Sequence, residues 1–269
     1  MNQKGWHMTG TTGISMSGTK RTISAIASVV LGIAVVGAVG FTLHKVSADP
    51  QKKLYATTNG TVQTSQGVLP HQFISLGVYA DPCNAGAHGA ATPGATNCGS
   101  HPSWPSYGPA THLVLKPHSY VTMTITVYDS GEELNNPYFG KVIGTVDASG
   151  AVSNTATYDG VAQTSLASTD VEHTFTLHGL PTSTQDPLFV NVPLPKNTDA
   201  EMADYNKKYA NSYDHKILNK GHVVTFSFIT GGKGEYVWNC EYPCGDGTYR
   251  GFGAVMGQIG YMAGKVSVA

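Results

Sequence analysis

Apolar and polar residues alternate in several short stretches of this sequence. From Tyr120 to Tyr128, apolar side chains alternate with threonines, which is the period of two expected for a strand with one buried face. The segment 171–177 repeats this pattern and puts His173 in the same row as Val171 and Phe175. Further strands are predicted at 222–230, 235–240 and 265–268. The pattern therefore favours an all-β domain with a histidine facing its core.

The segment 231–234 (GGKG) predicts a hairpin turn between the strands at 222–230 and 235–240. In an antiparallel pair the start of the first strand lies beside the end of the second. We therefore expect His222 and Cys240 to lie at the same end of the domain.

Two helices are expected in addition to the strands. Thr198 and Glu201 have the spacing of a capping box, which predicts one short surface helix over 202–209. The segment 23–43 carries no charge, and as a helix it would span about 31 Å, roughly the hydrocarbon thickness of a bilayer. It is predicted to be a transmembrane anchor behind a cytoplasmic tail at 1–22. A cleavable signal peptide is the alternative, because small residues follow at 46–48.

The composition supports an ordered β-protein and excludes one class of function. Hydrophobic residues make up 41% of the 269 positions, which is too many for a disordered chain, and the 32 glycines and 14 tyrosines suit short strands joined by turns. The 16 basic and 17 acidic residues nearly cancel, so binding of nucleic acid through a basic face is excluded. The region 44–110 reads as a linker, a leading strand and a loop, with the main domain at 111–269.

The four cysteines fall into two pairs. Cys83 and Cys98 bracket a loop rich in Gly, Ala and Pro, for which a disulfide in an oxidising compartment is expected. Together with the anchor, this pair predicts a single-pass protein of the cell membrane with its C-terminal domain outside the cytoplasm. Cys240 and Cys244 form a Cys-x-x-x-Cys pair, which could be a second disulfide or part of a metal site. Imidazole and thiolate groups gathered at one end of a β-sandwich form a set of copper ligands.

At these residues the sequence resembles the cupredoxin family. The segment 171–176 (VEHTFT) looks like the histidine-bearing strand of these proteins, and 234–240 (GEYVWNC) looks like their cysteine-bearing strand. The spacing of Cys240 and Cys244 is similar to the binuclear copper centre of cytochrome c oxidase subunit II and nitrous oxide reductase. The resemblance implies a cupredoxin-like Greek-key β-sandwich over 111–269 and a role in electron transfer. It also implies that His173, Cys240 and Cys244 bind the copper.

The sequence departs from this pattern downstream of the cysteines. Thr248 and Gly251 stand where the binuclear pattern has a histidine and a methionine, and no histidine follows His222. His222 is therefore a candidate replacement ligand. Met256, in a glycine-rich tail, is a candidate axial ligand.

The function expected from these residues is that of a membrane-anchored copper protein. It would carry single electrons, alone or as a subunit that serves a respiratory oxidase or another redox protein, without a substrate of its own. Two alternatives stay open at this stage: a copper-free structural module of a membrane complex, and a protein that stores or delivers copper.

Overall fold

The computed structural model describes residues 18–47, 52–80, 104–129, 136–179, 184–198, 200–201, 221–245 and 253–269. The chain divides into two compact units, Met1–Pro50 and Gln51–Ala269. In the first unit, helix α1 (Gly18–Ser47) covers the apolar segment 23–43. Among the described residues, no helix has both the length and the apolar character needed to cross a membrane.

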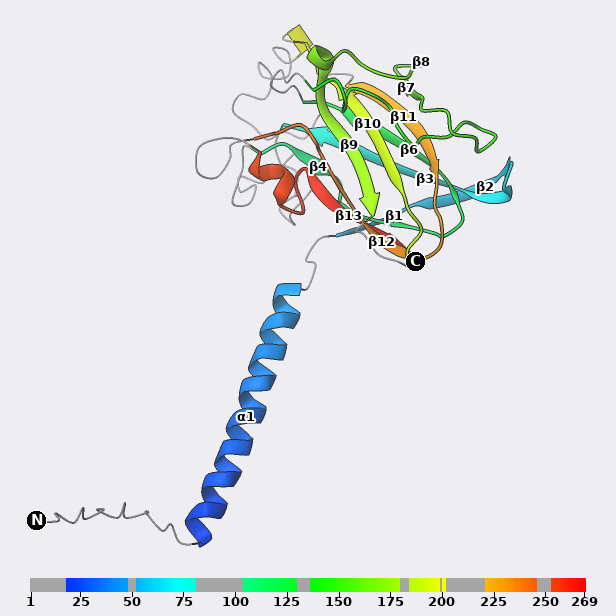
Figure 1. The fold of residues 1–269 in the computed structure, drawn as a ribbon. Helices are drawn as coiled ribbons and strands as arrows, with labels where there is room; N and C mark the ends of the chain where they lie inside the picture. Colours follow the sequence, from blue (N-terminus) through cyan, green and yellow to red (C-terminus); the bar gives the residue numbers. More distant parts are fainter. Residues whose placement is uncertain are drawn as a thin grey trace, which may run out of the picture. The chain divides into compact units, whose positions relative to one another are not determined.

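The second unit consists of two β-sheets (Figure 1). The first sheet, sheet A, has the strand order β1-β5-β13-β12-β9-β10. Its strands are β1 (Lys53–Tyr55), β5 (His112–Leu115), β9 (Val171–Gly179), β10 (Phe189–Pro195), β12 (Gly234–Asn239) and β13 (Ala263–Val268). Short 3-10 turns, η1 (Ser168–Asp170) and η2 (Ala254–Gly257), precede β9 and β13.

The second sheet, sheet B, has the order β2-β3-β6-β11-β7-β8, and β4 pairs with β3 beside this path. Its strands are β2 (Thr57–Thr64), β3 (Gly67–Tyr79), β4 (Ser106–Gly108), β6 (Tyr120–Val127), β7 (Ala156–Tyr158), β8 (Val161–Gln163) and β11 (His222–Ile229). The long strand β3 runs parallel to β6 and is in register with it from His71 to Val78.

An aromatic cluster fills the interior between the sheets. The ring of Phe175 from sheet A stacks on Trp238, with ring centroids 5.2 Å apart, and lies 6.0 Å from the ring of Phe226 in sheet B. Tyr107, from β4, packs edge-on against Trp238 at 4.6 Å. The buried indole Nε1–H of Trp238 donates a hydrogen bond to the carbonyl of Thr111 at 3.0 Å. This cluster holds the two layers together as a β-sandwich, because aromatic side chains bury large apolar areas and pack with defined geometry.

The strands predicted from alternation are confirmed as β6, β9, β11, β12 and β13. The predicted hairpin between 222–230 and 235–240 is wrong. Strand β11 pairs with β6 and β7 in sheet B, whereas β12 pairs with β13 and β9 in sheet A. Both strands bury one apolar face, but they do so from opposite sides of the interior. The glycine-rich segment therefore crosses between the layers.

The sandwich begins well before residue 111, where the resemblance placed the start of the domain. Strand β3 provides a central pairing in sheet B, and Trp104 and Tyr107 are buried in the core. Strands β1, β2, β3 and β4, which all precede residue 111, are thus part of the two sheets. Cys83 and Cys98 lie outside the described residues, so their disulfide stays a prediction.

The capping box predicted before the surface helix is confirmed. The Thr198 N–H and hydroxyl both donate to Glu201 Oε2 at 2.7 Å, and the Glu201 N–H donates back to the Thr198 hydroxyl at 3.4 Å. Ala200 and Glu201 are helical, and the helix predicted over 202–209 lies outside the described residues.

Candidate metal centre

Pairing of neighbouring strands brings one histidine and two cysteines together. Strand β12 runs antiparallel to β9, with Asn239 opposite Thr176. Just past the end of β12, the Cys240 sulfur accepts a hydrogen bond from the backbone N–H of Thr174 at 3.3 Å. His173 precedes Thr174 on β9, and Cys244 follows Cys240 in the next turn. Sequence-distant residues therefore meet at one end of sheet A.

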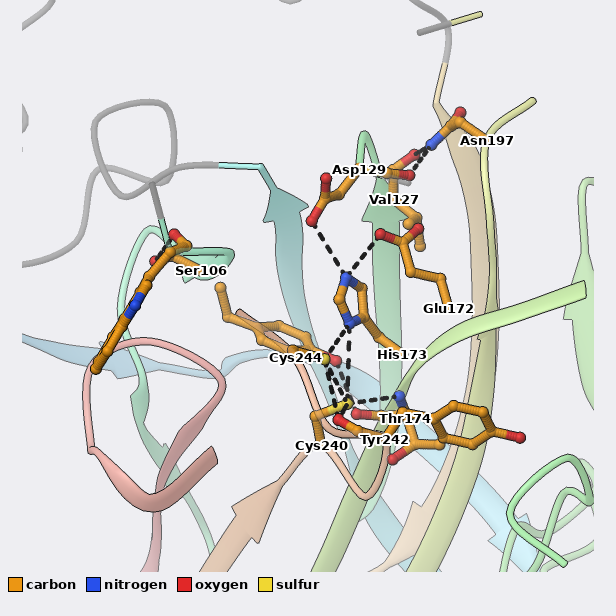
Figure 2. A network of polar contacts seen from close by, with 12 residues as sticks. Ser106, Val127, Asp129, Glu172, His173, Thr174, Asn197, Cys240, Tyr242 and Cys244 are labelled. Atoms are coloured by element: carbon orange, nitrogen blue, oxygen red, sulfur yellow. Dashed lines mark hydrogen bonds and ion pairs between the residues drawn. The ribbon is translucent and has the colours of Figure 1, made fainter. Parts of the chain in front are cut away.

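Three donor atoms form a compact buried cluster. The Nδ1 atom of His173 lies 3.0 Å from the Cys244 sulfur and 3.8 Å from the Cys240 sulfur, and the two sulfurs are 3.5 Å apart. Figure 2 shows the imidazole ring pointing toward both sulfurs. The exposed fractions are 2% for His173, 0% for Cys240 and 7% for Cys244. The structure thus brings together the three residues that the resemblance proposed as ligands.

Both cysteines are free thiols in this structure, so it does not contain the disulfide considered for Cys240 and Cys244. A bonded pair would have its sulfurs about 2.05 Å apart, far closer than these two. The carbonyl oxygen of Tyr242 lies 3.2 Å from the Cys240 sulfur and 3.0 Å from the Cys244 sulfur, within reach of a protonated thiol. Sequence reasoning missed this oxygen, because a backbone carbonyl carries no residue signature.

The electrostatics of the cluster favour one thiolate. Burial opposes ionisation of Cys240, but hydrogen bonds from Cys244 and His173 and the positive charge of His173 hold the pKa of Cys240 well below its usual value. The hydrogen bond to Cys240 and burial raise the pKa of Cys244 well above its usual value. Burial acts to lower the pKa of His173, but the negative charges around it raise that pKa well above 6.5. Thiolates are the form of cysteine that binds metals.

Two buried carboxylates lie on the other side of His173 (Figure 2). The Nε2 atom of His173 is 3.2 Å from Asp129 Oδ2 and 2.9 Å from Glu172 Oε1. Burial raises the pKa of Glu172 to about 8, although the positive charge of His173 opposes this shift. Sequence reasoning missed both residues. The available signals were an acidic residue directly after the apolar strand at 120–128 and another beside His173.

The two remaining candidate ligands take different positions. Met256, in η2, accepts a hydrogen bond on Sδ from the Cys244 N–H at 3.1 Å, so its thioether reaches the cysteine turn. His222 contacts carboxylates instead: its Nδ1 lies 2.8 Å from Asp159 Oδ2, and its Nε2 lies 3.8 Å from Glu201 Oε2. The structure brings Met256 to the cluster and gives His222 a different set of partners.

The donors at the cluster match the preferences of copper. Thiolate and thioether sulfurs are soft ligands suited to Cu(I), and imidazole binds both oxidation states. His173, Cys240 and Cys244 offer one atom each, all within 4.8 Å of one another, and none of them points into solvent. Side chains in this arrangement can hold one metal ion without large rearrangement.

No protein-family model matches the sequence, and no curated protein matches it. Solved structures similar to this chain include the copper protein rusticyanin, with 12% identity and a TM-score of 0.29 over 74% of this chain and 78% of that one. Auracyanin B has 13% identity and a TM-score of 0.26 over 78% and 96% of the two chains. A multicopper oxidase has 7% identity and a TM-score of 0.27 over 74% of this chain and 44% of its own.

Proposed function

We propose that this protein binds copper through His173, Cys240 and Cys244 and passes single electrons. The observation that carries the proposal is the cluster of one imidazole nitrogen and two cysteine sulfurs within 4.8 Å, enclosed at one end of the sandwich. Met256 is the candidate for a fourth, weaker donor because its sulfur already reaches Cys244. Copper held by such ligands supplies a one-electron couple between Cu(I) and Cu(II).

Burial of the site supports electron transfer over catalysis on a substrate. The three donor residues expose between 0% and 7% of their surface, so a substrate molecule has no direct access to their donor atoms, whereas an electron can pass through the intervening protein. The partner we propose is another redox protein, such as a respiratory oxidase.

Copper binding is tested on the full chain after reduction of any disulfide between Cys240 and Cys244. We expect wild-type protein to bind Cu(I) in competition with a chelator and, once oxidised, to show a thiolate-to-Cu(II) absorption band. His173→Ala should abolish the band because, among the residues that the structure describes, it removes the only imidazole in the thiol cluster. His178→Ala is the matched control: this half-buried histidine lies on the same strand but contacts the carbonyl of Gly179. It should leave the band unchanged.

A band that survives His173→Ala would overturn the site. A reduced wild-type chain that takes up no copper would overturn the function and would favour the copper-free structural module. Electron paramagnetic resonance of the oxidised protein then counts the metal ions, because a mixed-valence pair and a single Cu(II) give different hyperfine patterns. The described part of the chain places a single histidine in the cluster, which leads us to expect one copper ion per chain.

We also propose that the sandwich functions outside the cytoplasm, at the membrane surface, because Cys83 and Cys98 bracket a loop suited to a disulfide. Peptide mapping of exported protein without reductant should recover the linked peptide. Membrane fractionation tests whether the segment 23–43 anchors the protein. The full chain should be found in the membrane fraction, and a variant lacking residues 23–43 should not. Free thiols at both cysteines would remove the argument for the oxidising compartment.

A further inference from the structure

The imidazole of His173 has different partners on its two nitrogens. Nδ1 faces the sulfurs of Cys240 and Cys244, while Nε2 faces the carboxylates of Asp129 and Glu172. A neutral imidazole carries one proton, and a metal can bind only the nitrogen that lacks it. When a metal binds, the proton of the imidazole must therefore be on Nε2, so that the lone pair of Nδ1 is directed toward the metal beside the sulfurs.

The contact with Asp129 has the better geometry for holding that proton. Asp129 Oδ2 lies 3.2 Å from Nε2 in a direction that allows an N–H···O hydrogen bond. Glu172 Oε1 is closer, at 2.9 Å, but this contact lacks the geometry of a directed hydrogen bond. Asp129 is thus the acceptor that can fix the orientation of the ring.

Asp129 is itself held in place by a buried side chain. The Asn197 side-chain amide donates to the backbone carbonyl of Asp129 at 2.6 Å and to that of Val127 at 3.1 Å. The Asn197 backbone N–H donates to the same Asp129 carbonyl at 3.3 Å. These bonds connect Asn197, just after β10, to the backbone at the end of β6. They fix the position from which the Asp129 carboxylate reaches His173.

We propose that Asp129 is the positioning residue of the copper site: it holds the proton of His173 on Nε2 and so presents Nδ1 to the metal beside the two cysteines. The inference rests on the function proposed above. Carboxylates that accept the second N–H of a metal-binding histidine orient the ring and raise its basicity, and their loss commonly costs 10- to 100-fold in metal affinity.

The first test reads the proton directly by nuclear magnetic resonance of the full chain labelled with 15N-histidine. The signal of His173 is assigned by its loss in His173→Gln. In wild type we expect a slowly exchanging proton on Nε2, both in the metal-free protein and in the Cu(I)-loaded protein. In Asp129→Ala this proton should exchange rapidly with water. Asp159→Ala is the matched control, because it removes the carboxylate partner of a different histidine, His222, and should leave the His173 signal unchanged.

The second test measures Cu(I) affinity. Asp129→Ala should bind about 10- to 100-fold more weakly than wild type. Asp129→Asn retains an oxygen that can accept the same N–H, so its affinity should stay within a few fold of wild type. A role in packing alone would instead lower the thermal stability of Asp129→Ala while leaving the His173 signal and the affinity of the folded protein unchanged.

Two results would overturn the proposal. One is a His173 proton on Nδ1 in the Cu(I)-loaded protein, which would place the metal on the carboxylate side of the ring, among Asp129, Glu172 and His173. The other is an Nε2 proton whose exchange is insensitive to Asp129→Ala. If the wild-type chain binds no copper, the proposed function fails, but the metal-free spectra still decide whether Asp129 holds the proton.

Discussion

The backbone N–H of Cys244 donates a hydrogen bond to the Sδ atom of Met256 at 3.1 Å. This bond links the turn that carries the cysteine pair to η2, which packs against the core. A thioether sulfur has two lone pairs, so the bond leaves one free for a metal held by the neighbouring thiol. Met256 can therefore both position the turn and act as a weak ligand.

Replacing Met256 should change the reduction potential of bound copper. Met256→Gln introduces a harder oxygen donor that favours Cu(II), so we expect a lower potential, by about 60 mV for each tenfold change in the ratio of Cu(I) to Cu(II) affinity. A redox titration followed by the Cu(II) absorption measures it. Met123→Leu is the control, since this buried methionine lies on β6 and should leave the potential unchanged. An unchanged potential in Met256→Gln would exclude Met256 as a ligand.

Gly264→Ala should destabilise the sandwich. A Cβ at this position would overlap the carbonyl oxygen of Thr111 and come within 2.6 Å of the Trp238 ring. We expect a loss of about 1–3 kcal/mol in the free energy of unfolding, measured by urea denaturation of the full chain. Gly257→Ala, where a Cβ meets nothing within 4 Å, should change it by less than about 0.5 kcal/mol. Equal effects of the two substitutions would contradict the close packing of Gly264 against Thr111 and Trp238.

Phe175→Ala should cost more, because Phe175 contacts aromatic rings from both sheets. Large-to-small substitutions at buried phenylalanines typically cost about 3–5 kcal/mol. The urea midpoint measures this loss, and the exposed Val161→Ala on β8 provides the control, with little expected change. A small effect at Phe175 would mean that the interior can close around the missing ring.

The capping box should make stability depend on pH. Hydrogen bonds from the Thr198 backbone N–H and hydroxyl lower the pKa of Glu201. The ionised carboxylate therefore adds stability above the pKa of the unfolded chain, near 4.3, and this contribution is lost as the pH falls through the lowered folded-state value. Glu201→Gln keeps an acceptor oxygen but cannot ionise.

The variant should be less stable than wild type at pH 7 by about 0.2–1 kcal/mol, the range for exposed charge interactions. This difference should decrease as the pH falls from 7 to 3 and the carboxylate becomes protonated. Urea denaturation at both pH values measures it, and an equal difference at the two values would show that the charge of Glu201 plays no part.

Local sequence patterns determined much of the fold. A strand can be recognised from the alternation of apolar and polar residues within it. This pattern was sufficient to predict β6, β9, β11, β12 and β13. The dipeptide Asp159–Gly160 is a further local pattern, typical of a two-residue hairpin turn. Both residues have the positive φ that such a turn between β7 and β8 requires. The sequence likewise placed His173 on a buried row and identified the cysteine pair.

Only the tertiary structure decided which strands are neighbours. The buried face of a strand has the same pattern in either layer, so the sequence could not reveal that β11 and β12 belong to different sheets. The surroundings of His173 depend on the same assembly: Asp129 follows β6 in one sheet, whereas His173 lies on β9 in the other. Because their contact exists only when the two sheets pack, the sequence determined the candidate ligand and the packing of the sheets determined its orientation.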